Sequence, residues 1–156
     1  MGWHAMTVAE LPAVAAISAE VHGDYAESEE VYAERLRLWP AGCFIWEQGD
    51  GVAGLLVAHP WHRAAAPALG VLLGAIPEDA DSFYLHDIAL LPATRGHGAG
   101  SAATRLVLDL ARQAGHCEVS LVAVNGAERF WMAQGFAIVG GGGYGPGTYR
   151  MRRSVD

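Results

Sequence analysis

The chain has 156 residues, of which 52% are hydrophobic and 17% are charged, and its formal net charge is −7 at pH 7. This length and apolar content predict one globular domain over residues 1–156 and exclude a disordered chain. The negative charge, without any basic run, argues against a nucleic-acid partner. All ten cationic residues are arginine, and the absence of lysine excludes a Walker P-loop and a pyridoxal Schiff-base enzyme.

The cysteines and the hydropathy pattern indicate the compartment. Cys43 and Cys117 are far apart and form no CxxC motif, so we expect buried free thiols in a reducing compartment. The first residues show no charged segment followed by an apolar one, so no signal peptide is expected. The apolar stretch 52–76 is interrupted at residues 59–63, which predicts that it does not span a membrane. We therefore expect a cytoplasmic protein without a membrane partner.

Two helices and a β-hairpin are predicted in the first half of the chain. Thr7 and Glu10 form a capping box, which indicates a helix start, and Pro40 ends the second helical pattern. The predicted elements are a short strand near 3–6, helices over 8–21 and 28–39, and strands over 43–47 and 51–59. Residues 61–77 are the least readable part, and 64–67 in particular suggest a loop.

Strands and helices alternate in the second half. The predicted elements are strands over 83–91, 119–124, 136–139 and 148–152, and helices over 101–113 and 126–134. Asn125 is expected to cap the later helix and Gly135 to end it. This order of elements suits an α/β fold in which a single mixed sheet has helices on both faces.

A glycine-rich loop precedes the helix predicted over 101–113. The loop carries Gly96, Gly98 and Gly100, so several backbone N–H groups before the helix have no internal partner. These groups can converge on an anion, and the positive end of the helix dipole favours negative charge there. Glycine allows a ligand to approach the backbone closely, and Arg95 adds a permanent cation. The loop is predicted to bind a phosphate or pyrophosphate.

Two motifs in this half resemble a known family. Arg95-Gly96-His97-Gly98-Ala99-Gly100 is similar to the Q/R-x-x-G-x-G/A signature of the GCN5-related N-acetyltransferases (GNAT), and residues 121–136 resemble that family's next strand, helix and closing Gly-Phe. The resemblance covers roughly residues 83–152. It implies the GNAT fold, with a mixed, mostly antiparallel sheet of six to seven strands and about four helices. It also implies acetyl-CoA as co-substrate, with its pyrophosphate on the glycine loop.

The resemblance further implies a reaction and a coenzyme site. The expected reaction transfers an acetyl group to a primary amine of a small-molecule or amino-acid-like acceptor, by direct attack of the amine on the thioester. Dimers are frequent in the family, so the resemblance allows a homodimer. The residues expected to contact the coenzyme are Ile88, Ala89, Leu90, Arg95, Gly96, His97, Gly98, Ala99, Gly100, Ser101, Asn125, Phe130 and Trp131.

Catalytic residues are expected on the strand before the glycine loop. His86 and Asp87 are the candidate bases, and their side chains should point to opposite faces unless a bulge intervenes, so at most one should face the amine. By resemblance, the N–H of Leu90 contacts the oxyanion. The family often uses a tyrosine to protonate the departing thiolate, but Trp131 stands at that position. Tyr144, or water, could take this role.

The sequence leaves two alternative functions and suggests one further site. Because Trp131 replaces the tyrosine, the chain could be a non-catalytic acyl-CoA-binding sensor or partner subunit. Residues 98–103 also fit the dinucleotide pattern G-x-G-x-x-A, but Glu118 precedes the next strand, whereas the ribose-binding acid should follow one. His59 and His62 lack further ligands nearby, so no metal is expected. The family resemblance places Trp61 and Tyr25 at the acceptor pocket.

Overall fold

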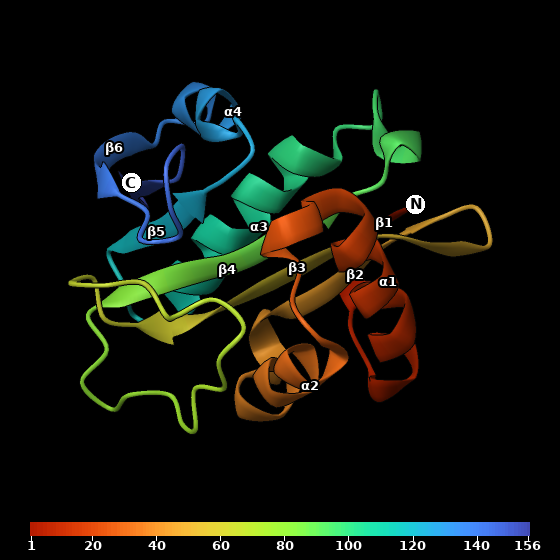
Figure 1. The fold of residues 1–156 in the computed structure, drawn as a ribbon, viewed down its shortest axis with the longest axis horizontal. Coiled ribbons are helices and arrows are strands. Elements are labelled where there is room, and N and C mark those ends of the chain that lie inside the picture. The colour runs from red at the N-terminus through yellow and green to blue at the C-terminus, as the bar shows by residue number, and fades with distance from the viewer.

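The computed structural model describes residues 1–156. The strands are β1 (Gly2–Ala5), β2 (Cys43–Gln48), β3 (Gly51–Trp61), β4 (Ser82–Leu90), β5 (Glu118–Ala123), β6 (Ala137–Gly141) and β7 (Tyr149–Ser154). The α-helices are α1 (Leu11–His22), α2 (Glu29–Leu38), α3 (Ala99–Gln113) and α4 (Glu128–Ala133). Together they form one seven-stranded sheet, in the order β1-β2-β3-β4-β5-β7-β6, with helices on both faces (Figure 1). The predicted mixed, mostly antiparallel sheet is confirmed.

Strands β4 and β5 form the one parallel pair of the sheet, and they stay together over a short distance. Residues Phe83–Leu85 of β4 pair with Val119–Leu121 of β5, whereas β4 continues to Leu90 without this partner. On its other edge β4 pairs with β3 in antiparallel register up to Leu90. The two parallel strands therefore diverge beyond Leu85, and this opens the centre of the sheet.

The two faces of the sheet carry separate hydrophobic cores. On β3, Leu55 and Val57 pack with α1 and α2, whereas Leu56 and Ala58 belong to the core that includes α3 and Trp131. This alternation follows from the period of two along a strand. The long buried strand thus serves both layers, which explains why residues 53–60 read as a nearly continuous apolar run.

A β-bulge in β4 changes the direction of its side chains. Val57 pairs with Asp87 and Ala58 pairs with Leu85, so His86 has no partner of its own on β3. An extra residue in one strand shifts the alternation by one position. As a result, His86 and Asp87 both face the layer of α1 and α2. The opposite orientation expected for a regular strand therefore does not occur, because the bulge places both side chains on one face of the sheet.

Most predicted elements are confirmed, with boundaries moved by a few residues. The capping box is present, because the Thr7 N–H donates to Glu10 Oε1 at 2.8 Å, although a 3₁₀ turn precedes α1. Gly135 ends α4 with φ 90°. The predicted cap at Asn125 is wrong: Ala127 occupies the N-cap position of α4, and Asn125 adopts a left-handed φ of 55°.

Three further observations concern the long loop, the cysteines and the length of the helices. No helix or strand lies between Trp61 and Ser82. Both cysteines are free, but Cys117 is exposed, contrary to the expectation that both are buried, while burial raises the pKa of the Cys43 thiol to about 12. None of the helices combines the length and the apolar character needed to cross a bilayer.

Candidate functional site

The glycine loop, residues 95–100, presents open backbone amides before α3. Gly96 and Gly98 have φ values of 82° and 71°, a left-handed conformation that favours glycine. The N–H groups of Gly96, Gly98, Ala99, Gly100 and Ser101 find no acceptor within the protein. Unpaired amides at the positive end of a helix form an anion-binding arrangement.

Two amides of the glycine loop are not available to a ligand. The Arg95 N–H donates to the Pro92 carbonyl at 3.1 Å, and the His97 N–H donates to the Thr94 carbonyl at 3.2 Å. These bonds form the short turn that connects β4 to the loop. The side chains of Arg95 and His97 are exposed beside the open amides, so these two residues can contribute to a site through their side chains.

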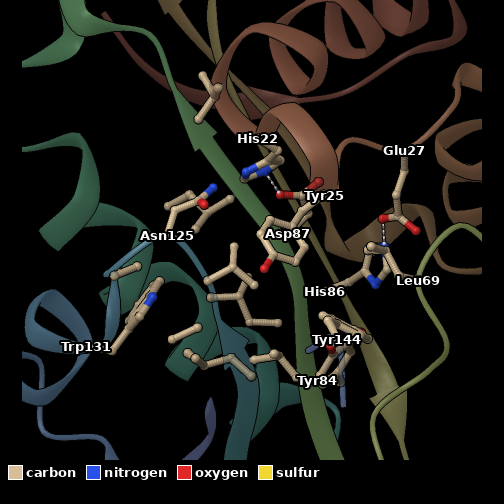
Figure 2. A pocket seen from close by; sticks show the side chains of 18 residues that line it. His22, Tyr25, Glu27, Leu69, Tyr84, His86, Asp87, Asn125, Trp131 and Tyr144 are labelled. Carbon is tan, nitrogen blue, oxygen red and sulfur yellow. Dashed lines mark hydrogen bonds and ion pairs between the residues drawn. The ribbon is translucent and has the colours of Figure 1, made fainter. Parts of the chain in front are cut away.

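A cavity of about 220 Å³ lies where β4 and β5 diverge. Its walls come from the end of α1 and the segment after it, from β4 and β5, from the β5–α4 connection, and from Leu69 and Tyr144 in two loops (Figure 2). Most of the lining is apolar. The polar side chains that line it are His22, Tyr25, Glu27, Tyr84, His86, Asp87, Asn125, Trp131 and Tyr144.

The first polar group at the cavity is centred on Asp87. His22 Nε2 lies 2.5 Å from Asp87 Oδ1, and the Tyr32 hydroxyl donates to Asp87 Oδ2. The Ser18 and Tyr32 hydroxyls are 2.8 Å apart, and Ser18 Oγ accepts the Glu27 N–H. Both oxygens of the Asp87 carboxylate are therefore engaged by side chains of α1 and α2.

This arrangement keeps Asp87 charged. Burial alone would raise the pKa of Asp87, but the charge and hydrogen bond of His22, with the Tyr32 hydroxyl, lower it below the ordinary value. Burial alone would lower the pKa of His22, but the Asp87 charge and hydrogen bond raise it. Burial and the Asp87 charge also raise the pKa of Tyr32, so its hydroxyl stays protonated.

The second polar group joins His86 to a distant loop. His86 Nε2 lies 2.5 Å from Glu27 Oε1, and Glu27 Oε2 accepts the N–H of Gly70 at 2.7 Å. The side chains of His86 and Glu27 are 1% and 3% exposed. Glu27 thus connects β4 to the long β3–β4 loop, which brings Leu69 to the cavity.

Tyr144 closes another side of the cavity. Its hydroxyl donates to the Pro67 carbonyl at 2.7 Å and lies 3.4 Å from the buried Tyr84 hydroxyl. Burial raises the pKa of Tyr144. The loop between β6 and β7 therefore delivers a protonated phenol to the cavity, where Figure 2 shows it beside Tyr84 and below His86.

The backbone of β4 turns N–H groups toward the gap. The Leu91 N–H donates to the Ala53 carbonyl of β3 at 2.9 Å. In an antiparallel ladder, alternate residues direct their polar groups to opposite sides, so Ile88 and Leu90 direct their N–H groups away from β3. On that side β5 has already separated from β4. The intervening Ala89 points its buried side chain into the core beneath α1.

Helix α4 connects the cavity to the glycine loop. Trp131 is buried and lines the cavity, while its neighbour Phe130 contacts the start of α3 so closely that a Cβ at Gly100 would lie 2.9 Å from Phe130 Cζ. Asn125 also lines the cavity (Figure 2). Helix α4 therefore lies between the glycine loop and the cavity and contacts both.

Sequence reasoning missed several residues of this region and misplaced one. Tyr25 lines the cavity, as expected, but Trp61 lies against His59 and His62 and is not part of the wall. His22 and Glu27 were not among the expected site residues, because no local pattern shows what a distant strand places beside them. No group of three or more His, Cys, Asp or Glu side chains is arranged to hold a metal ion.

One family model matches most of the chain. Residues 8–136 match the family model described as "Acetyltransferase (GNAT) family". No curated protein sequence matches the chain. Many solved structures do match, at low identity.

Three of these structures show how much the matching proteins differ in their described activity. The loading GNATL domain of CurA from Lyngbya majuscula is 16% identical with a TM-score of 0.83, covering 99% of this chain and 97% of that one. GphF, a GNAT-like decarboxylase in complex with isobutyryl-CoA, is 19% identical with a TM-score of 0.80 over the full length of both chains. The ribosomal-protein-S18-alanine N-acetyltransferase from Escherichia coli is 18% identical with a TM-score of 0.69, covering 99% and 93%. At these identities the structures establish the fold.

Proposed function

Because the chain belongs to the acetyltransferase (GNAT) family, we propose that it is an acetyl-CoA-dependent N-acetyltransferase. The proposed acceptor is a primary amine of a small molecule or an amino-acid-like compound, which attacks the thioester directly. The observation that carries this proposal is the gap between β4 and β5, with the open amides of the glycine loop beside it. This combination suits a long ligand with an anionic end.

The glycine loop supports the binding of coenzyme A. The diphosphate would accept hydrogen bonds from the amides of Gly96, Gly98, Ala99, Gly100 and Ser101. Among the structural relatives, GphF was solved with isobutyryl-CoA. The exposed side chains of Arg95 and His97 lie beside the same amides and would add positive or polar contacts. We propose that these residues hold the anionic end of acetyl-CoA.

The gap supports the binding of the acetyl-bearing arm. The N–H groups of Ile88 and Leu90 point toward it, and Ala89 lies between them. An amide arm could extend β4 by hydrogen bonding where β5 has separated, and the Leu90 N–H would then stabilise the oxyanion that forms from the thioester carbonyl. Asn125, Phe130 and Trp131 would contact the arm from the opposite side.

The cavity supports the acceptor end of the reaction. Tyr144 offers a protonated phenol that could return a proton to the departing thiolate, in place of the family's usual tyrosine. His86 and Asp87 supply polar groups at the same cavity. Holding the amine and the thioester together in this way would supply much of the rate enhancement by proximity.

One observation favours the second candidate, an acyl-CoA-binding sensor without turnover. Trp131 occupies the position of the family's tyrosine, and its buried indole cannot act as an acid near neutral pH. A thiol-release assay with acetyl-CoA and a panel of primary amines separates the two functions. We expect release that depends on the amine. Saturable acetyl-CoA binding without any such release would contradict the enzyme and leave the sensor.

A further inference from the structure

Two histidine–carboxylate pairs meet at the cavity, and they differ in whether a ligand can reach the histidine. The His22 side chain is 14% exposed, and its Nδ1 has no protein partner and is not among the buried unpaired atoms. The His86 side chain is 1% exposed, its Nε2 is engaged by Glu27, and its Nδ1 is buried and unpaired. Of the two, His22 is the one that presents a nitrogen to the cavity.

Asp87 lines the cavity, but both of its carboxylate oxygens already have protein partners. Its carboxylate oxygens are taken by His22 and Tyr32, and its side chain is 7% exposed. An ionised Asp87 can only accept hydrogen bonds, so neutral His22 must carry its proton on Nε2. The lone pair of His22 is then on Nδ1. In Figure 2 the ring of His22 lies at the cavity, which Asn125 also lines.

We infer that His22 is the catalytic base of the proposed acetyl transfer, and that Asp87 is the positioning residue that fixes its orientation and tautomer. This inference rests on the proposed function and assigns the base within it. It replaces Asp87 and His86, the two bases that the sequence suggested, with a residue from the end of α1. Tyr32 and Ser18 support Asp87 from the side away from the cavity.

The proposed proton transfer balances without a further reactant. The acceptor ammonium gives one proton to His22 Nδ1, and the neutral amine then attacks the thioester carbon to form the C–N bond. The C–S bond breaks, and its electron pair leaves with sulfur as a thiolate. Tyr144 gives its phenolic proton to that sulfur and takes up the remaining extra proton from nitrogen, and His22 releases its own proton to solvent. The products are an amide, free coenzyme A and one proton.

The charges around His22 set the pH at which it works. Asp87 on β4 and Glu27 after α1 are the negative groups that act on it, whereas α2 contributes the neutral hydroxyl of Tyr32 and the β5–α4 connection the neutral Asn125. Together the two carboxylates raise the pKa of His22 above 6.5, despite its burial. Because the base must be neutral to act, kcat/KM should rise with pH through this raised pKa.

The test compares pH–rate profiles of variants, using acetyl-CoA and the best primary amine of the panel. His22→Gln should lower kcat by roughly 10²- to 10⁴-fold and remove the acidic limb, while the Kd for acetyl-CoA stays unchanged. Asp87→Asn should move the acidic limb to lower pH, because it removes the charge that raises the pKa of His22. His62→Gln is the matched control, since His62 pairs with Asp79 at the surface. It should change neither kcat nor the position of the acidic limb.

A second measurement is chemical rescue of a variant that lacks the imidazole. His22→Ala leaves a space beside the cavity, and added imidazole should restore part of the lost kcat, which a purely structural role would not allow. An unchanged acidic limb in His22→Gln, or loss of that limb in His86→Gln alone, would overturn the assignment while leaving the acetyltransferase in place. If the unmodified protein released no thiol with any amine, the proposed function itself would fail, and the assignment with it.

Discussion

The most consequential residues of the glycine loop are those whose backbone meets the ligand. Gly98 combines a left-handed φ of 71° with an amide that no protein group engages. Open space surrounds the position that a Cβ would occupy. A side chain added here meets no protein atom and lies next to the amides proposed to bind the diphosphate, so its charge decides the effect on binding.

Gly98→Asp is expected to abolish acetyl-CoA binding, because it adds an anion where the diphosphate would lie. Isothermal titration calorimetry measures this directly. Gly115→Asp is the matched control: Gly115 also has a positive φ, of 84°, and open space, but it lies at the other end of α3. It should therefore bear the same backbone strain and charge without loss of binding. Equal affinity in both variants would count against the glycine loop as the diphosphate site.

For single residues, the sequence predicts sites formed by neighbouring positions but not contacts between distant ones. Arg95, Gly96 and Gly98 are adjacent in the chain, so their pattern could be read directly. His22 and Asp87 are 65 positions apart, and only folding brings them within hydrogen-bonding distance. The contact is therefore absent from any local pattern.

Among the elements, helix α2 anchors the loop that closes the cavity region. Glu34 accepts hydrogen bonds from the Leu73 and Gly74 N–H groups at 2.7 and 2.9 Å, and from Arg35 at 2.8 Å. Arg35 also donates to the Val71 carbonyl. A buried ion pair thus replaces regular secondary structure as the support of residues 71–74.

Glu34→Gln is expected to destabilise the fold by about 3 kcal/mol at pH 7, because it leaves the buried Arg35 without its counter-ion. Urea unfolding measures the difference. Burial alone would raise the pKa of Glu34, but the backbone N–H groups and Arg35 lower it below 4.5. The stabilisation by this carboxylate is therefore complete above pH 4.5 and is lost as the pH falls through the lowered pKa.

The same unfolding experiment has a surface control. Asp109 pairs with Arg112 on exposed α3, and Asp109→Asn should cost at most about 0.5 kcal/mol. At acid pH the difference in the free energy of unfolding between the unmodified protein and Glu34→Gln should become smaller. If this difference stayed constant at acid pH, or if Glu34→Gln lost no more stability than Asp109→Asn, Glu34 would not support the loop.

The elements differ in how far the sequence predicts them. Helix α3 has a clear apolar period and was placed within two residues of its observed start. The bulge at His86 could not be located from the sequence, because β4 is largely buried on both faces and a one-position shift leaves no visible break in its apolar pattern. Residues 61–77 were the least readable part because buried carboxylates of other segments hold them, at Gly70 and Leu73.

Across the whole molecule, the divergence of β4 and β5 determines the site. The order of elements predicted a mixed sheet with two helical layers, and this is confirmed. It did not predict where two paired strands would separate, since that depends on the packing of both layers. The separation exposes backbone N–H groups of β4 in the middle of the sheet, where a polar ligand can satisfy them.

Ligand binding at such a central position should stabilise the entire fold. At an acetyl-CoA concentration 100 times its Kd, we expect about 2.7 kcal/mol of added stability. For a domain of this size, that corresponds to a rise in Tm of roughly 5–10 °C. Differential scanning fluorimetry measures the shift, and NAD at the same concentration should produce none. A shift with NAD but not with acetyl-CoA would favour a nicotinamide enzyme instead.

The most direct measurement is a crystal structure of the protein with acetyl-CoA. We predict that the diphosphate accepts hydrogen bonds from the amides of Gly96 and of residues 98–101, and that the arm lies along β4 in the gap. The thioester oxygen should lie within hydrogen-bonding distance of the Leu90 N–H. A diphosphate bound elsewhere, or an arm that runs outside the gap between β4 and β5, would contradict the account.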